Sequence, residues 1–309
     1  MMARKIILDI DPGVADTMAV CLALSDPQLE VVAVTATGGN VSARQATRNV
    51  QAIIEQLDPP HWPRIGAADL DQPLRTDGRE LYGLDGFCGA KLGVAELHHR
   101  HSSAKVIIDE IRAASDRVTI VTGGPLSNVA VALQREPDLA TQVGHLVIVG
   151  GTLNGPGNVT AAAEFNIYCD AVAAHQVFHS PVTKTLIPLD ISSQVILGYD
   201  LLSHLTAELT PATRLLHSML PGMYHTYRQR LGLEGIFVHE VVGLMAVLSP
   251  ELFTTDRLYG DVETGDCLTH GATVIDRRQR STGMPNMDVA IQLDVPAVVE
   301  AICCRLKIG

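Results

Sequence analysis

Aromatic residues and clustered positive charge are both scarce in this sequence. Phe, Trp and Tyr together make up 4% of the chain, which is little for a protein that stacks the bases of single-stranded nucleic acid. The net charge at pH 7 is −11 and no dense basic patch is present, so we expect no nucleic-acid partner. The densest basic run, Asp276-Arg277-Arg278-Gln279-Arg280, is predicted to be a surface turn.

Paired cysteines and long apolar runs are missing as well. The six cysteines show no CxxC spacing and no pairing with histidine, which disfavours a structural zinc site and a disulfide framework. The first residues lead directly into a strand pattern without the apolar region of a signal peptide, and no stretch approaches the length of a membrane span. We therefore expect a cytoplasmic protein with reduced thiols and no membrane partner.

The remaining composition, 47% hydrophobic and 18% charged, is typical of a globular chain. Runs rich in β-branched residues predict strands at Lys5–Asp9, Leu29–Thr35, Val118–Thr122, His145–Val149 and Val182–Ile187. Predicted helices are Asp16–Ser25, Ala43–Leu57, Ser127–Arg135 and Val241–Leu248, with a mainly helical segment near residues 205–237. This alternation predicts an α/β fold with a Rossmann-like core: a single open, mostly parallel sheet with helices on both faces. No linker composition interrupts it, so residues 1–309 are expected to form one domain.

Three carboxylates, those of Asp9, Asp11 and Asp16, follow one another at the end of the first predicted strand. Like charges this close raise each other's pKa and resist burial, and a hard cation with oxygen ligands relieves the repulsion. The simpler interpretation makes Asp16 an ordinary acid at a helix start and Pro12-Gly13 an ordinary turn. The density of charge favours metal binding.

Glycines and small polar residues follow three further predicted strands. These segments are Gly38-Gly39-Asn40, Gly123–Asn128 and Gly150–Asn158. Ligands of open α/β sheets bind at the carboxyl ends of the strands. We therefore expect the four strand ends to meet in one crevice.

In these segments the chain resembles the inosine-uridine-preferring nucleoside hydrolase family. The run Asp9-Ile10-Asp11-Pro12-Gly13-Val14-Ala15-Asp16 is similar to the family's opening motif, Asp-x-Asp-Pro-Gly-x-Asp-Asp. Further similar blocks follow in order across nearly the whole chain: Gly39-Asn40 with Ala46–Asn49, Gly123–Asn128, Pro156–Thr160, Ala163–Tyr168, His239-Glu240 and Pro250–Phe253.

The resemblance implies a calcium-dependent enzyme that hydrolyses the N-glycosidic bond of nucleosides to ribose and a free base, through an oxocarbenium-like transition state. By motif position, the ligands of Ca²⁺ would be Asp11, Asp16, the carbonyl of Gly123, and Glu240. Asp11 would act as general base on a water whose pKa the cation lowers, and His239 would give a proton to the leaving base. Asn40, Asn158, Glu164 and Asn166 would bind the ribose, and Tyr82 and Tyr227 would decide the base preference. Homodimers or homotetramers are usual in the family.

Simpler readings of several of these residues stay open. Glu164 and Asn166, two residues apart, would share one face of an extended segment, which suits hydrogen bonds to a sugar or a solvated strand. Asn158 after Pro-Gly fits an ordinary turn, and His239 fits a structural histidine. Tyr224, His225 and Tyr227 also fit an amphipathic surface helix.

Three positions depart from the family pattern. Ala15 replaces an acid that in the family grips the ribose, chiefly at the 2′-hydroxyl, and the lost charge-assisted hydrogen bond is worth about 1.5–3 kcal/mol, or more if it tightens in the transition state. Glu240 replaces Asp, and the extra methylene moves the carboxylate by about 1.5 Å, which the flexible coordination of calcium can absorb. Tyr82 stands where many members carry His.

Two interpretations follow from these departures. One is a working hydrolase with an altered sugar or metal preference, and the other is a nucleoside- or ribose-binding protein that hydrolyses poorly. A third, from a different class, is an aspartyl-phosphate phosphatase, because Asp9-x-Asp11 after a strand also suits a phosphoryl-accepting nucleophile. We favour the hydrolase, because Asp11, Asp16, Asn158, Glu164, Asn166 and His239 are all retained.

Two inexpensive assays separate these classes. We expect release of reducing sugar from inosine or uridine, and no release of nitrophenol from a nitrophenyl phosphate. The opposite pattern would support the phosphatase, and inactivity on both with measurable nucleoside affinity would support the binding protein.

Overall fold

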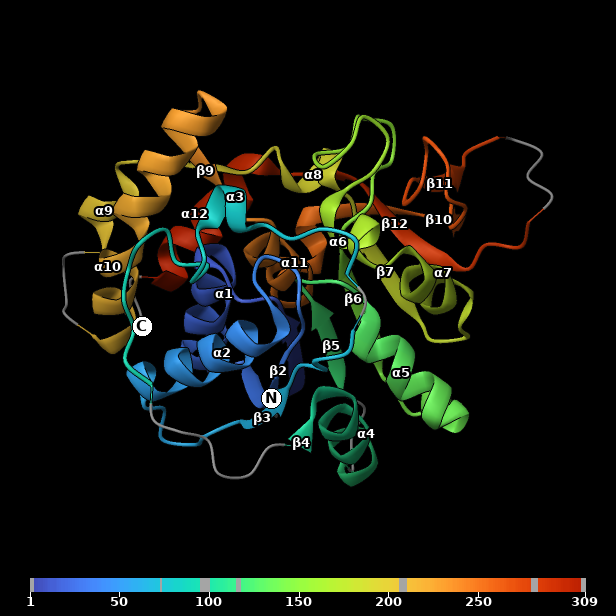
Figure 1. Cartoon of the computed structure of the whole chain (residues 1–309), viewed down its shortest axis with the longest axis horizontal. Coiled ribbons are helices and arrows are strands. Elements are labelled where there is room, and N and C mark those ends of the chain that lie inside the picture. The colour runs from blue at the N-terminus through green and yellow to red at the C-terminus, as the bar shows by residue number, and fades with distance from the viewer. Residues whose placement is uncertain are drawn as a thin grey trace.

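The computed structural model describes residues 3–72, 74–94, 101–114, 118–205, 210–278 and 283–306. Within these ranges, ten strands form one sheet that is flanked by helices (Figure 1). From one edge to the other, the strands are β11 (Thr273–Asp276), β10 (Phe253–Val262), β12 (Met287–Leu293), β7 (Lys184–Ile187), β6 (His145–Val149), β5 (Thr119–Thr122), β1 (Arg4–Ile10), β2 (Leu29–Ala36), β3 (Arg64–Ala67) and β4 (His101–Ser102). A separate antiparallel pair is formed by β8 (Ile196–Gly198) and β9 (Gly235–Phe237).

The sheet is open and mostly parallel, as the sequence predicts. Every neighbouring pair from β12 to β4 is parallel, whereas β10 is antiparallel to both β11 and β12. The parallel strands are nearly continuous apolar runs because helices bury them on both sides.

Two layers of helices cover the two faces of the sheet. One face is covered by α1 (Val14–Ser25), α2 (Ala43–Leu57), α10 (Pro211–Thr226), α11 (His239–Leu248) and α12 (Val295–Leu306), and the other by α4 (Ser103–Ala113), α5 (Ser127–Arg135) and α7 (Ala171–His179). Successive residues of β1 point to opposite faces: Ile6 and Leu8 join the first apolar layer, and Ile7 joins the second. The shorter helical segments are α3 (Arg79–Tyr82), η1 (Pro137–Thr141), α6 (Phe165–Cys169), α8 (Leu189–Ser192), α9 (Leu201–His204), η2 (Tyr227–Leu231) and η3 (Pro250–Leu252).

The predicted elements agree closely with these bounds. The strand His145–Val149 and the helices Ala43–Leu57 and Ser127–Arg135 are found as predicted, and α1 and α11 each begin two residues earlier than expected. The segment near residues 205–237 is helical in α10 and η2, but residues 206–209 lie outside the described ranges.

The end of that segment, Gly235–Phe237, is a strand and not a helix. The reason is the close approach of β8: a Cβ on Gly235 would lie 2.4 Å from Cγ2 of Ile196. In the basic run, Asp276 ends β11, and Gln279 and Arg280 lie outside the described residues.

The order of the strands fixes where a ligand can bind. The chain runs outward from β1 through β2 and β3 to β4, then returns to the other side of β1 with β5 and continues through β6 to β7. The loops that follow β1 and β5 therefore diverge, and such a switch point leaves a crevice at the carboxyl ends of the strands. None of the described helices has the length and apolar character needed to cross a membrane.

Candidate functional site

Three of the predicted carboxylates converge at the carboxyl end of β1. Asp11 directly follows this strand, Asp16 lies in the first turn of α1, and Glu240 lies in the first turn of α11. One oxygen of Asp11, Oδ2, accepts the backbone N–H of Asn40 at 2.7 Å, and Oδ2 of Asp16 accepts that of Gly13 at 2.8 Å. Asp11 and Asp16 are thereby each held in place by one oxygen.

The other oxygens of the cluster have no protein partner. Among the described residues, five buried side-chain atoms lack a hydrogen bond, and they include Oδ1 of Asp11, Oδ1 of Asp16 and Oε2 of Glu240. Buried polar atoms are almost always hydrogen-bonded in proteins. Three unpartnered carboxylate oxygens in one cluster therefore indicate a binding site for a cation that several oxygens coordinate.

The raised pKa values of the three carboxylates also indicate that this cluster binds a cation. Burial raises the pKa of Asp11 well above its usual range, and the neighbouring charges of Asp16 and Glu240 raise it further. Burial likewise raises the pKa of Asp16 to about 7 and that of Glu240 well above its ordinary value, with the charge of Asp16 adding to the effect at Glu240. A divalent cation would reverse these shifts, and oxygen-only ligands fit a hard ion such as Ca²⁺.

Gly123, the predicted backbone ligand, lies directly against this cluster. A Cβ at this position would be 2.8 Å from Cγ of Glu240 and 3.1 Å from Oδ1 of Asp16. The carbonyl oxygen of Gly123 accepts an N–H from the side chain of Asn166 at 2.9 Å. A glycine is required here because any side chain would occupy the space between the two carboxylates.

Asp9 belongs to a different set of contacts. Its Oδ1 accepts hydrogen bonds from Oγ1 of Thr35 at 2.6 Å and from Nδ2 of Asn128 at 2.8 Å. These bonds join β1 to β2 and α5, on the face of the sheet opposite to that of Leu8. The carboxylate of Asp9 therefore connects elements of the fold next to the cluster.

A cleft of about 710 Å³ is lined by one carboxylate of the cluster, that of Glu240, whereas Asp11 and Asp16 are buried and are not among its lining residues. Eight of the predicted residues line it: Asn40, Tyr82, Asn158, Glu164, Asn166, Tyr227, His239 and Glu240. The rest of the lining includes the apolar side chains Leu81, Val159, Phe165, Leu189, Leu231, Leu233 and Phe237. A cleft with carboxylates and amides at one end and apolar walls suits a ligand with a polar part and a flat apolar part.

Glu164 and Asn166 do not lie on an extended segment, so that expectation was wrong. Glu164 is the N-cap of α6: its carboxylate accepts the backbone N–H groups of Asn166 at 3.1 Å and Ile167 at 3.2 Å. The N–H of Gly151 donates to the same carboxylate at 2.9 Å. Unpaired N–H groups at a helix start attract a carboxylate, and this turns Glu164 and Asn166 toward the cleft from a helix terminus.

The two other amide side chains have structural contacts as well. Nδ2 of Asn40 donates to the carbonyl of Asp11 at 3.1 Å, which orients the loop after β2 against the carboxylates. Oδ1 of Asn158 accepts the N–H of Phe165 at 2.8 Å, and the side chain is exposed at the rim of the cleft. Asn158 is thus more than a turn residue, because it fixes the start of α6.

His239 is oriented by a serine that sequence reasoning did not identify. Its Nδ1 lies 2.8 Å from Oγ of Ser192, and that hydroxyl donates to the carbonyl of Pro188 at 3.2 Å. In the tautomer in which Ser192 donates to Pro188, Nδ1–H of His239 donates to Oγ, and Nε2 is unprotonated in the neutral ring. Burial lowers the pKa of His239 to about 4, and the ring stacks on Phe237 with 5.3 Å between centroids.

Two tyrosines that line the cleft, Tyr82 and Tyr227, lie close to each other. The hydroxyls of Tyr82, on α3, and Tyr227, on η2, are 3.4 Å apart. Burial raises the pKa of both phenols, so both keep their protons at neutral pH. Tyr224 is directed elsewhere: its hydroxyl donates to the carbonyl of Gly198 at 2.5 Å. His225 is exposed on α10.

Ala15 is the second residue of α1, adjacent to Asp16, and packs against the first apolar layer. It adds no polar side-chain atom to the cluster. Glu240 in contrast still contributes a carboxylate, and its Cγ lies where a Cβ on Gly123 would come within 2.8 Å of it.

Comparison with known proteins agrees with this geometry. The family model of the inosine-uridine preferring nucleoside hydrolases matches residues 6–300. The chain is 32% identical over 311 residues to the pyrimidine-specific ribonucleoside hydrolase RihA of Escherichia fergusonii and 33% identical to RihA of Salmonella schwarzengrund, covering 99% of both chains in each pair.

Solved structures of similar architecture come from the same group of proteins. A purine-preferring ribonucleoside hydrolase from Gardnerella vaginalis is 28% identical and superposes with a TM-score of 0.90, covering 99% of this chain and 100% of that one. A plant nucleoside hydrolase is 27% identical with a TM-score of 0.89, covering 98% and 99% of the two chains.

The unpartnered carboxylate oxygens generate a prediction about calcium. In protein stripped with a chelator, millimolar Ca²⁺ should raise the melting temperature, because an ion that binds only the folded state stabilises it by about 2.7 kcal/mol at 100 times its Kd. Differential scanning fluorimetry measures the shift.

Asp16→Asn provides the matched control. Without the ion, this variant should melt at the same temperature as the wild type or higher, because one repelling charge is gone, and it should gain less from Ca²⁺. Equal calcium shifts in the two proteins, or none in either, would contradict the assignment of the cation to this cluster.

Proposed function

The chain belongs to the inosine-uridine preferring nucleoside hydrolase family, and we propose that it hydrolyses the N-glycosidic bond of ribonucleosides to ribose and a free base with the help of a bound Ca²⁺. The observation that carries this proposal is a cluster of buried carboxylates with unpartnered oxygens that reaches the cleft through Glu240, where amide side chains and apolar, aromatic walls complete the lining. A nucleoside has the matching parts: a sugar with several hydroxyls and a flat base.

The cation would be held by Asp11, Asp16 and Glu240 together with the carbonyl of Gly123. When bound, Ca²⁺ binds ribose hydroxyls and lowers the pKa of the attacking water. The protein holds these ligands ready: Asn40 fixes one oxygen of Asp11, and Gly13 fixes one oxygen of Asp16.

Asp11 is the general base in this proposal. Its Oδ2 is held by Asn40, which leaves Oδ1 without a partner and able to take a proton from water. A base must be within hydrogen-bond reach of the proton that it removes, and a carboxylate that is fully buried but unpartnered on one oxygen meets that need. The strand β1 and the turn at Pro12-Gly13 keep Asp11 buried beside Asp16 and Glu240, and of these three only Glu240 lines the cleft.

The ribose would be bound by residues around the start of α6 and the loop after β2. These are Asn158, Glu164, Asn166 and Asn40, and all four line the cleft. Because three backbone N–H groups hold the carboxylate of Glu164, its position is fixed before a sugar arrives. Pre-positioned acceptors lose little entropy on binding and support a defined sugar geometry.

The leaving base would lie between Tyr82, Tyr227 and the apolar walls. In its neutral form His239 presents an unprotonated Nε2, so it accepts a hydrogen bond from the base and becomes a proton donor only when the ring is protonated. The hydroxyls of Tyr82 and Tyr227 retain their protons and are the other donors near the base. The two tyrosines thus donate hydrogen bonds to a leaving base as negative charge develops on it, and His239 adds a proton only when its ring is protonated.

A cytoplasmic role in purine or pyrimidine salvage, as a homodimer or homotetramer, completes the proposal. It rests on the family and on the expectations from the sequence. Sedimentation equilibrium of the full chain measures the oligomeric state directly.

One alternative is favoured by a specific observation. Ala15 brings no side-chain oxygen to the cluster where the family pattern has an acid, so the protein would bind a nucleoside and hydrolyse it slowly. The phosphatase is disfavoured, since none of the described residues that line the cleft is a lysine or arginine and a phosphoryl group needs such a partner.

The proposed function predicts calcium-dependent release of base from a nucleoside panel. Inosine, guanosine, uridine and cytidine are assayed with and without Ca²⁺, because the similar proteins are named pyrimidine-specific in one case and purine-preferring in another. We expect base release from at least one ribonucleoside, at least 10-fold slower after chelation. Tight binding without turnover in the whole panel would replace the hydrolase with the binding protein.

The missing acid at position 15 predicts a gain of function. Ala15→Asp should raise kcat/KM on ribonucleosides by roughly 10- to 100-fold, because a charge-assisted hydrogen bond to the 2′-hydroxyl is worth about 1.5–3 kcal/mol. The matching 2′-deoxyribonucleosides should gain little, since they lack that hydroxyl. An equal gain on both sugars would show that the new carboxylate acts on the metal instead, and Ala15→Asn controls for size.

A further inference from the structure

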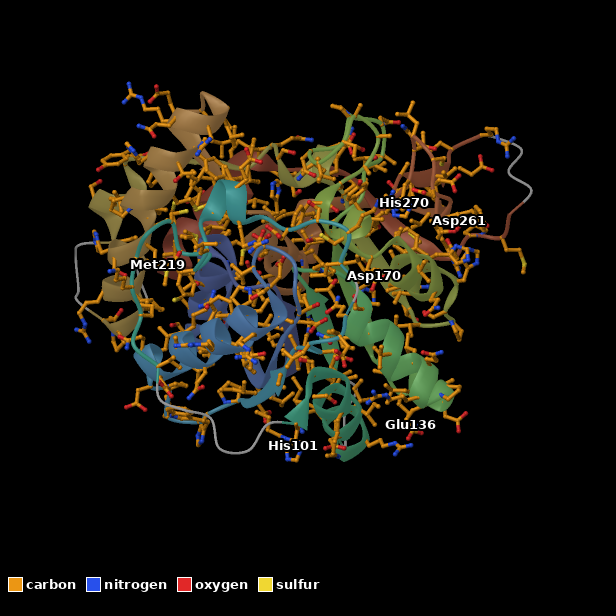
Figure 2. The ribbon with its side chains drawn as sticks, in the orientation of Figure 1. His101, Glu136, Asp170, Met219, Asp261 and His270 are labelled. Carbon is orange, nitrogen blue, oxygen red and sulfur yellow. The ribbon has the colours of Figure 1, made fainter. Side chains whose placement is uncertain are left out.

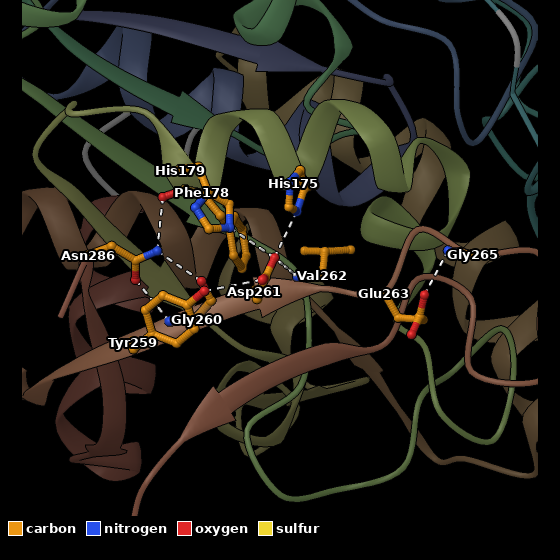
Figure 3. Close-up of polar contacts among 10 residues, drawn as sticks. All are labelled: His175, Phe178, His179, Tyr259, Gly260, Asp261, Val262, Glu263, Gly265 and Asn286. Atoms are coloured by element: carbon orange, nitrogen blue, oxygen red, sulfur yellow. Dashed lines mark hydrogen bonds and ion pairs between the residues drawn. The ribbon is translucent and has the colours of Figure 1, made fainter. Parts of the chain in front are cut away.

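Two histidines and a carboxylate converge at the end of the molecule opposite the helix α10 (Figures 2 and 3). His175 and His179 lie one turn apart on α7, and Asp261 lies near the end of β10. Nδ1 of His175 is 2.8 Å and Nε2 of His179 is 3.0 Å from Oδ1 of Asp261. Figure 2 places Asp261 at one end of the long axis and Met219, on α10, at the other.

The fold brings these three side chains together for simple reasons. Residues four apart in a helix share one face, so both imidazoles point from α7 toward the sheet. The helix packs on β10, and Figure 3 shows both rings directed at the carboxylate on this strand. The ring centroids of the histidines are 4.5 Å apart.

The carboxylate is fixed by its own neighbours. The backbone N–H of Val262 donates to Oδ1 of Asp261 at 2.7 Å, and the hydroxyl of Tyr259 donates to Oδ2 at 3.2 Å. Although partial burial opposes it, the hydrogen bonds from Val262 and the two imidazoles hold the pKa of Asp261 below its usual range. The carboxylate of Asp261 is therefore charged and held in a fixed orientation.

The helix and the strand are also fastened to each other beside the cluster. Nδ2 of Asn286 donates to the carbonyls of Phe178 at 3.1 Å and Gly260 at 2.9 Å, and its Oδ1 accepts the N–H of Gly260 at 2.9 Å. One side chain thus ties the end of α7 to β10 (Figure 3). The distance between the histidines and the carboxylate is set by this packing.

We propose that His175, His179 and Asp261 form a second metal site, for a divalent cation of the Zn²⁺ class. One ligand atom from each residue lies within 4.8 Å of the others, and tetrahedral zinc with bonds of about 2.0 Å separates its ligands by roughly 3.3 Å. Two imidazoles and one carboxylate are ligands that suit Zn²⁺, Co²⁺ or Ni²⁺. The side chains are 31–42% exposed, so water completes the coordination and the ion has access.

This site differs chemically from the carboxylate cluster described above. Calcium selects oxygen ligands and the cluster at Asp11 offers only these, whereas imidazole nitrogen selects borderline transition metals. None of the three residues is among those that line the cleft. The second site therefore stands whether or not the chain hydrolyses nucleosides.

The function of the site would be to clamp α7 to β10. A metal that binds only the folded chain stabilises it by mass action, and the proton of each neutral imidazole then lies on the ring nitrogen that does not bind the metal. The helix α7 follows α6, whose first turn carries Asn166. The clamp would hold the ribose side of the cleft against the edge of the sheet.

The test titrates Zn²⁺ into chelator-stripped protein that contains millimolar Ca²⁺ to fill the oxygen-ligand site. We expect one equivalent of Zn²⁺ bound per chain by equilibrium dialysis, and a rise in melting temperature of at least about 3 °C. With Co²⁺ in place of Zn²⁺, a visible d–d absorption should appear on binding, because imidazole ligands give a distorted four- or five-coordinate centre.

The decisive variant is His179→Gln. Glutamine keeps an N–H that can donate to Asp261 but is a poor metal ligand, so this variant should fold and should lose the zinc equivalent, the melting shift and the cobalt absorption. His61→Ala, at an exposed histidine outside the cluster, should retain all three. Binding unchanged in both His179→Gln and Asp261→Asn, or absent from the wild type, would overturn the proposal and leave a hydrogen-bonded cluster only.

Discussion

The mutual repulsion of three buried carboxylates is the constraint around which this structure is organised. Asp11, Asp16 and Glu240 are brought together from two strand–helix junctions, and Asp11 and Asp16 are each anchored through one oxygen. An arrangement of this kind destabilises the folded chain at neutral pH unless a positive charge lies among the carboxylates. The surrounding glycines, Gly123 above all, leave the space that such a charge needs. The lining of the cleft then decides what else can approach it.

Much of this arrangement could be predicted from the sequence, because buried parallel strands are recognisable as short apolar runs in the local sequence. The apolar runs at β1, β5 and β6 and the polar residues that follow them place Asp11 and Gly123 at one edge of the sheet by topology alone. The role of Asp9 could not be seen in this way. Only the structure shows that Thr35 and Asn128 use one of its oxygens to join three elements.

Contacts between residues that only the tertiary structure brings together could not be predicted from the sequence. The pair Glu164 and Asn166 reads as an extended segment by its spacing, yet the unpaired N–H groups of α6 recruit the Glu164 carboxylate as a cap. Ser192 carries no motif, and only its position beside His239 gives it a role. His175 and Asp261 are far apart in the sequence, so their meeting follows from the packing of α7 on β10 and from no local pattern.

The spacing of the carboxylates along the chain has a consequence for the order of folding. Asp11 and Asp16 lie five residues apart, whereas Glu240 lies more than 200 residues further along the sequence. Before the chain folds, only Asp9 is close to Asp11 and Asp16 in sequence, and the charge of Glu240 does not yet add to their repulsion. The site acquires its full charge density only when α11 docks beside α1. A cation that needs all three carboxylates would therefore bind after α11 has packed beside α1, and would stabilise the folded chain without starting its folding.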